Sequence, residues 1–193
     1  SSARAVSLLL KAPRARRRAL VAPTASYTAV SLACGLAALA LTGPALLSWI
    51  PAFCVLLLPA LVLAARRLER ATLAGGLTTA AAALMCVVVA CPDPREVLWC
   101  TPLARSAVTD STLLFAYFFG TVLYVKTNIR QRENPRFWWA SVSWHALATV
   151  GAALLVAGHL AAPAWTALFV LATARAALIP RRQPRLTPRT IGL

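Results

Sequence analysis

Two apolar stretches joined by a basic loop decide the fold of this chain. The sequence AVTDSTLLFAYFFGTVLYV (residues 107–125) is followed by KTNIRQRENPR (126–136) and then by FWWASVSWHALATVGAALLVAG (137–158). Each apolar run matches the roughly 20 residues that a helix needs to cross a hydrocarbon core about 30 Å thick. Neither run alternates apolar and polar residues, as the strands of a membrane barrel do. The stretch therefore predicts two membrane-spanning helices with a basic loop between them.

Four further apolar runs have a similar length, at residues 19–41, 45–65, 71–91 and 163–179. Of the 193 residues, 60% are hydrophobic and only 13% are charged, whereas a soluble domain has about 25% charged residues. We therefore predict an all-α polytopic membrane protein, a bundle of six transmembrane helices over residues 19–179. A basic segment (1–18) precedes the bundle and is interpreted as the end of a further, missing helix. A basic tail (180–193) follows the bundle.

The basic residues alternate with the predicted spans. The net charge is +15, and 18 of the 20 basic residues lie before run one, between runs two and three, between runs four and five, or within and after run six. Only Arg95 and Arg105 lie in the other connections. Basic loops stay in the cytoplasm, so we expect a plasma-membrane protein with both ends cytoplasmic. The expected partners are anionic lipid headgroups and not nucleic acid.

Polar side chains within a span are the first candidates for a functional site. With a helical rise of 1.5 Å per residue, His145 and Tyr117 lie roughly 12 and 13 Å from the cytoplasmic ends of their spans, and Tyr27 has a similar position in run one. These three residues predict a cavity that opens to the cytoplasm. In an alternative interpretation Tyr117 and His145 bond each other beside Gly120. Three threonines are then expected to bond carbonyls of their own helices: Thr78, Thr79 and Thr173.

Two charged residues lie near the ends of predicted spans. Asp110 is three residues inside run four, and we interpret it as an N-cap, a position that aspartate favours. The alternative for Asp110 is a role in transport. Arg175 lies near the end of run six, where a long basic side chain extends to the membrane surface. The alternative for Arg175 is to bind an anion in the predicted cavity.

The basic loop between runs four and five is a candidate site for phosphate or lipid headgroups. The side chains that suit this chemistry are Tyr124, Lys126, Thr127, Arg130 and Arg132. In the alternative interpretation these charges only set the topology and contact anionic headgroups.

Cysteine and histidine spacing indicates no metal or cofactor site and no catalytic residue. Cys91 and Cys100 flank a predicted outward loop, and a disulfide between them is one possibility. The alternative is two unrelated thiols. His145 and His159 are 14 residues apart, or about 21 Å along one helix, which is too far to share one heme iron.

Several motifs resemble the YwiC-like family of bacterial integral membrane proteins. They are FGTVLYVKTNIRQR (119–132), ASVSWHA (140–146), RALVAP (18–23) and AARR (64–67). The resemblance implies a polytopic membrane protein whose biochemical role is not established. Family members begin with a stretch like PNQHGAW, which is missing here, so we expect an N-terminally truncated member. The family-like positions are Tyr124, Lys126, Thr127, Arg130, Arg132, Trp144 and His145.

The sequence supports two classes of function and favours the non-enzymatic one. The first is a small-molecule carrier or a partner in a membrane complex, with a polar cavity facing the cytoplasm. The second is a membrane transferase that resembles the UbiA prenyltransferases and acts on a diphosphate lipid. Those enzymes hold magnesium with aspartate-rich motifs, whereas Asp93 and Asp110 are both predicted at or near the outer surface.

Overall fold

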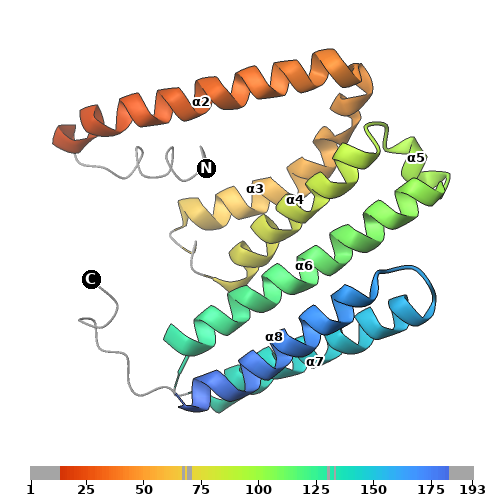
Figure 1. The fold of residues 1–193 in the computed structure, drawn as a ribbon. Helices are drawn as coiled ribbons and strands as arrows, with labels where there is room; N and C mark the ends of the chain where they lie inside the picture. Colours follow the sequence, from red (N-terminus) through yellow and green to blue (C-terminus); the bar gives the residue numbers. More distant parts are fainter. Residues whose placement is uncertain (1–13, 67, 69–70, 130, 133, 183–193) are drawn as a thin grey trace.

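The computed structural model describes residues 14–66, 68, 71–129, 131–132 and 134–182, which are helical apart from short connections and contain no strand (Figure 1). The helices are α2 (Arg14–Thr42), η1 (Pro44–Trp49), α3 (Ile50–Ala65), α4 (Thr72–Ala90), α5 (Arg95–Leu98), α6 (Pro102–Ile129), α7 (Pro135–Ala157) and α8 (Pro163–Arg182). The predicted all-α fold is confirmed.

Six of these segments are long and apolar enough to cross a membrane. They are α2, η1 together with α3, α4, α6, α7 and α8. Many exposed side chains are large and apolar, such as Leu41 and Val89, as expected for helices whose outer faces contact lipid tails. The chain is thus a multi-pass membrane protein with the six spans that the sequence predicts.

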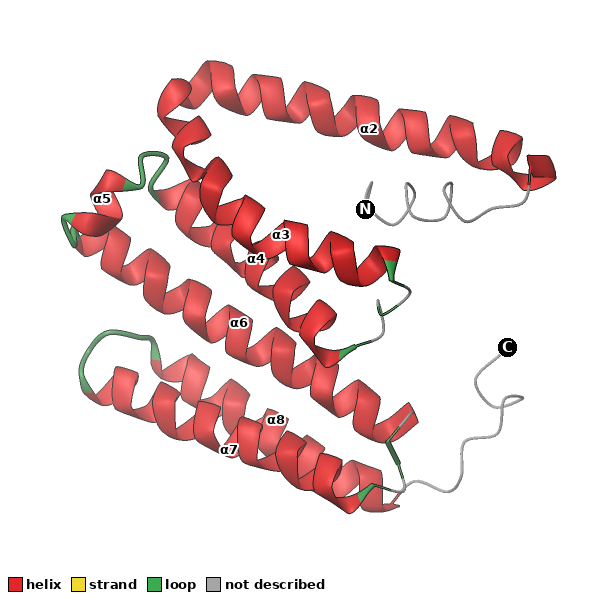
Figure 2. Cartoon of the chain, turned by 180° about the vertical axis from the view of Figure 1, so that it is seen from behind, coloured by secondary structure: helices red, strands yellow, loops and turns green. Residues whose placement is uncertain are grey.

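The helices from η1 to α8 pack side by side in a bundle (Figure 2). The most extensive contacts join α4 to α6 and α7 to α8, and α3 packs on α4 while α6 also packs on α7. One apolar cluster, around Trp49, Val87 and Val88, lies where η1 meets the end of α4. A second cluster, around Leu113, Ala152 and Phe169, lies between α6, α7 and α8.

Helix α2 stands apart from this bundle, and its main contacts are with η1 (Figure 1). Gly43 links α2 to η1 with a φ of 82°, a left-handed conformation that glycine adopts without strain. The side chains of residues 25–42 are almost all exposed. The lateral position of α2 therefore depends on few contacts within this chain.

The basic segments meet at one end of the bundle, which we call the basic end. Helices α3, α6 and α8 finish there, and α4 and α7 begin there (Figure 1). Arg66 and Arg132 lie in connections at this end, whereas Arg95 and Arg105 lie near α5 at the opposite end. Residues 1–13, Arg67, Arg70, Arg130 and residues 183–193 fall outside the described residues.

Candidate anion-binding site between α6, α7 and α8

The three residues of the predicted cavity do not come together. Tyr27 is on α2 and is 57% exposed, and α2 packs mainly on η1. The Tyr117 ring faces α8, with its centroid 6.3 Å from that of Phe169. His145 is buried in the contact between α6 and α7. Similar depth in the membrane thus did not bring Tyr27 beside the other two.

His145 is wedged against the backbone of α6. It is 1% exposed, and its Nδ1 lies 2.7 Å from the carbonyl oxygen of Ser141. Because a carbonyl only accepts, Nδ1 carries the proton and donates it. Nε2 faces Gly120, where an added Cβ would lie 2.8 Å from it. Among the described residues Nε2 has no hydrogen-bond partner, so the alternative bond to Tyr117 is not formed.

Arg175 has a guanidinium group that is partly buried between helices. Its guanidinium carbon lies 4.4 Å from the centroid of the Tyr124 ring, a cation–π geometry that holds the head against α6. Its Nε and Nη2 are buried, and neither has a hydrogen-bond partner within the described part of the chain. These two N–H groups form one edge of the guanidinium fork, the edge that binds carboxylate or phosphate through two parallel hydrogen bonds.

The threonine hydroxyl groups considered in the sequence analysis all have hydrogen-bond partners. Thr149 and Thr173 are 2.9 Å apart at their Oγ1 atoms, and Thr173 also donates to the carbonyl of Phe169. Thr78 and Thr79 donate to carbonyls of their own helix. The predicted bonding of these threonines is confirmed. In contrast, Ser141 Oγ is buried without a partner among the described residues.

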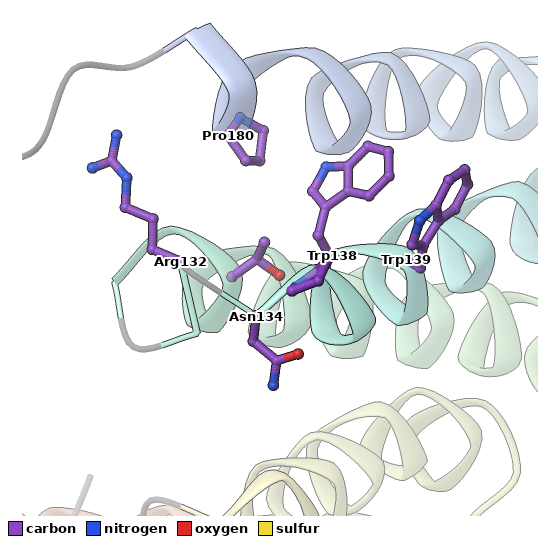
Figure 3. A pocket seen from close by; sticks show the side chains of 7 residues that line it. Arg132, Asn134, Trp138, Trp139 and Pro180 are labelled. Carbon is purple, nitrogen blue, oxygen red and sulfur yellow. The ribbon is translucent and has the colours of Figure 1, made fainter.

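A pocket of about 260 Å³ opens at the basic end, beside the ends of α6, α7 and α8 (Figure 3). Its lining residues come from the ends of three helices and the basic loop: Thr127, Arg132, Asn134, Pro135, Trp138, Trp139 and Pro180. In Figure 3 the Trp138 ring extends between α7 and α8. Asn134 caps α7 by accepting hydrogen bonds from the amides of Arg136 and Phe137.

Spacing along the three helices shows how far the pocket lies from the side chains of Tyr124, Ser141 and Arg175. Thr127 is one turn beyond Tyr124 on α6, and Trp138 is one turn before Ser141 on α7. Pro180 is five residues beyond Arg175 on α8, or about 8 Å along the helix. The pocket therefore lies on the basic-end side of these residues, and Thr127 and Trp138 line its wall.

The residues predicted to bind anions through the basic loop divide among three places. Tyr124 packs on Arg175, and Thr127 and Arg132 line the pocket. Lys126 points to α4, where its Nζ donates to Thr72 Oγ1 over 3.0 Å. Arg130 lies outside the described residues. The loop therefore does not present these side chains as one cluster.

The structure contradicts the predicted role of Asp110 as an N-cap. Helix α6 begins at Pro102, so Asp110 is two turns inside the helix and is not its N-cap. Thr101 takes the capping position and accepts a hydrogen bond from the amide of Ala104. Asp110 instead accepts a hydrogen bond of 3.2 Å from Trp165 Nε1 of α8. The sequence did not indicate this pair or the Arg175–Tyr124 pair.

The cysteines near α5 are free thiols, and no disulfide joins Cys91 to Cys100. Cys91 is buried and Cys100 is exposed. Burial raises the pKa of the Cys91 thiol above its ordinary value, and the negative charge of Glu96 adds to this effect. In the described part of the chain, no three histidine, cysteine or acidic side chains lie close enough together to hold a metal ion.

Comparison with known proteins found a short similarity to a protein whose role is not established. A stretch of 31 residues is 58% identical to an uncharacterized protein of Haemophilus influenzae, and it covers 16% of this chain and 13% of that protein. No solved structure is significantly similar to the chain.

The family match covers α2, α3 and α4, whereas the candidate site is built by α6, α7 and α8. Two of the motifs from the sequence, at 18–23 and 64–67, lie within the match, and the basic loop lies beyond it. Residues 2–90 match the family model of YwiC-like proteins, and the predicted resemblance to that family is confirmed.

Proposed function

We propose that this protein is a membrane carrier that binds a small anion between α6, α7 and α8. The observation that supports the proposal is the buried edge of Arg175. Its Nε and Nη2 are shielded from solvent and have no acceptor among the described residues. A buried polar group without a partner is costly, and nearly all such groups in proteins are paired. An anionic ligand would supply the two missing acceptors.

The chemistry of this arrangement favours a carboxylate or a phosphate. Arginine keeps its charge in an apolar environment and presents a planar fork to two oxygens of one anion. The Tyr124 ring holds the guanidinium in position, so less side-chain freedom is lost when the ligand binds. Ser141 of α7 also has a buried hydroxyl without a partner among the described residues. Arg175 also lies close enough to His145 for an electrostatic interaction.

The route to the site leads from the basic end. The pocket at the basic end is open there and is lined by Arg132, whose charge attracts anions from solution. On the other side, the apolar cluster of Leu113, Ala152 and Phe169 closes the interface. A site that is reached from one side and closed on the other is what a carrier needs in one of its two states.

We further propose that the basic end faces the cytoplasm of a bacterial cell. The positive-inside rule supports this orientation, because the described loops at this end contain Arg66 and Arg132. The ligand then enters from the cytoplasm, and the protein lies in the plasma membrane.

The first experiment asks which anions remain bound to the purified protein. Native mass spectrometry of the full chain in mild detergent should detect an anionic adduct. The adduct should be lost in Arg175→Gln and retained in Arg105→Gln, which removes an exposed arginine at the opposite end. Thermal unfolding of both variants serves as a check on folding. An adduct that persists in a folded Arg175→Gln protein would contradict the proposed site.

The second experiment measures affinity and transport with simple probes. Inorganic phosphate and succinate, one for each anion chemistry, are titrated while tryptophan fluorescence is recorded. Losing a buried charged contact costs about 2–5 kcal/mol, so Arg175→Gln should weaken binding by about thirtyfold or more. Counterflow of the better probe in proteoliposomes then tests the carrier. Binding without counterflow would argue for a receptor or a partner in a complex.

A further inference from the structure

Asp110 is an acidic side chain within a membrane span. The chain has five acidic residues, and the other four lie outside the six spans. Asp110 is eight residues beyond Pro102, the first residue of α6, or about 12 Å along the helix. It does not cap α6, so helix capping does not explain an acid at this position. An ionisable group within a span is costly, and such groups are usually functional.

The Asp110 carboxylate has a hydrogen bond but no counter-ion. Its Oδ1 accepts a hydrogen bond of 3.2 Å from Trp165 Nε1 of α8. Within the described residues this contact is its one hydrogen bond, and no basic side chain forms an ion pair with it. Asp110 is half-buried, and Trp165 lies in the first turn of α8. The pair is therefore near the membrane surface at the end opposite the basic end.

No neighbouring helix supplies a positive charge to this carboxylate. Helix α4 contains no charged residue, and its titratable group is the thiol of Cys86. The titratable groups of α7 and α8 lie nearer the basic end and are Arg136, His145, Arg175, Arg181 and Arg182. Helix α5 has one charge of each sign, on Arg95 and Glu96. Arg105 on α6 and His159 after α7 are exposed.

The Asp110–Trp165 pair adjoins the apolar cluster that closes the anion site on this side. Trp165 packs against that cluster, which contains Leu113, Ala152 and Phe169. The rings of Trp165 and Phe169 are stacked, with centroids 6.2 Å apart. Leu113 is one turn beyond Asp110 on α6. A change in the contact between Asp110 and Trp165 therefore acts directly on the residues that close the site.

We propose that Asp110 is a proton-binding site that controls this closure, an inference that rests on the proposed carrier function. A proton from the solution opposite the basic end adds to Oδ2, and the carboxylate becomes a neutral acid. The hydrogen bond from Trp165 then loses its charged acceptor and about half its strength. The closure loosens, and loss of the proton to the same solution restores it. A metal ion needs several ligands, and the described residues contain no suitable group of three.

Substitutions on both sides of the contact test the proposal. Asp110→Asn retains the acceptor but has no charge to lose, and Trp165→Phe retains a ring but removes the donor. The matched controls are Asp93→Asn, in the connection between α4 and α5, and Trp99→Phe, whose ring is exposed near α5. Thermal unfolding of each full-length variant in detergent checks folding.

The first measurement is counterflow in proteoliposomes at mildly acidic and mildly alkaline pH. Labelled phosphate and labelled succinate are used separately, and variants are compared at equal pH because the probes also titrate. Loss of the charge on one hydrogen bond accounts for about a fivefold change. We expect wild type and both controls to exchange faster at acidic pH by about this factor. Asp110→Asn and Trp165→Phe should exchange equally fast at both pH values.

The second measurement needs no ligand. Hydrogen–deuterium exchange compares the amides of residues 163–169 in wild type and Asp110→Asn at the same mildly alkaline pH. These amides should exchange faster in Asp110→Asn, because this variant resembles the protonated state. Asp93→Asn should exchange like wild type.

Either of two results in folded protein would overturn the proton site. They are a pH response of counterflow in Asp110→Asn that equals that of wild type, and unchanged amide exchange in Asp110→Asn. If wild type exchanges neither phosphate nor succinate, the carrier function is contradicted, and amide exchange alone decides whether Asp110 controls the closure. Failure of this inference is therefore distinguishable from failure of the proposed function.

Discussion

At the scale of single residues, Gly120 determines how closely α6 and α7 approach. A Cβ at this position would lie 2.8 Å from Nε2 and 3.1 Å from Cε1 of His145, and 3.2 Å from the Trp144 ring. Trp144 in turn donates a hydrogen bond of 2.9 Å to the carbonyl of Ala116. Both rings therefore lie directly on the α6 backbone, and neither can withdraw without losing a contact.

We expect Gly120→Ala to destabilise the protein by about 1–3 kcal/mol, the usual cost of overpacking a core. The control is Gly151→Ala, because Gly151 lies within α7 and an added Cβ there meets nothing within 4 Å. Alanine stabilises a helix relative to glycine by up to about 1 kcal/mol, so the control should gain slightly. Unfolding in detergent by heat or denaturant measures both changes. Equal stabilisation of the two variants would contradict the packing described here.

Residue depth could be predicted from the sequence, but residue partners could not. Counting from the basic loop correctly placed His145 and Gly120 within the spans, because each residue of a helix rises by a fixed amount. The same count cannot say which helices are neighbours. Tyr27 therefore was assigned to a cavity that it does not reach. Arg175 was expected to extend to the membrane surface, and it lies on the Tyr124 ring instead.

At the scale of elements, apolar runs in the sequence predict which segments span the membrane. They are a less reliable guide to where each helix begins and ends. The run at 107–125 predicted a helix that starts near Asp110, but α6 begins at Pro102 and has 28 residues. That length is about 42 Å, which exceeds a hydrocarbon core of about 30 Å. The extra turns lie outside the apolar run, where hydropathy gives no signal. Proline at the first helical position and Thr101 before it are the local signals for the true start.

The segment around α5 yields a prediction about its two thiols. Cys91 is buried, and Trp49 Nε1 donates to its carbonyl oxygen over 3.1 Å, whereas Cys100 is exposed. Burial first, and Glu96 second, raise the pKa of Cys91, so less of the reactive thiolate is present at a given pH. We expect a maleimide to label Cys100 at least about tenfold faster than Cys91 at about pH 8.

Single-cysteine variants make this labelling specific, and the rate for Cys91 should rise toward higher pH because deprotonation is delayed. A membrane-impermeant maleimide applied to intact cells adds a test of orientation. If the basic end faces the cytoplasm, the reagent reaches Cys100 without permeabilisation. Labelling of Cys100 only in lysed cells would reverse the proposed orientation.

At the scale of the whole molecule, the charge pattern correctly predicted which connections share an end. The described basic connections between α3 and α4 and between α6 and α7 lie together, opposite α5 (Figure 1). The pattern does not reveal lateral packing, because all spans are similarly apolar and lipid is as good an apolar neighbour as another helix. Contacts such as α4 on α6 depend instead on side-chain shape, as with Gly75 and Gly76 against Val122 and Phe119.

The separation of α2 from the bundle is the molecular feature most open to a direct test. A protease site inserted at Gly43 allows α2 to be cut from η1–α8 after the full chain has been inserted and purified. None of the residues in the α2 span is buried, so little contact area within the chain holds it. We expect the cut α2 to separate from the bundle on size exclusion in detergent, and the remaining bundle to keep its unfolding temperature. The matched control is a cut at Gly158, between α7 and α8, which pack extensively, so those fragments should stay together. If α2 remains bound after the cut at Gly43, then it has a docking face on the bundle that its contacts with η1 do not explain.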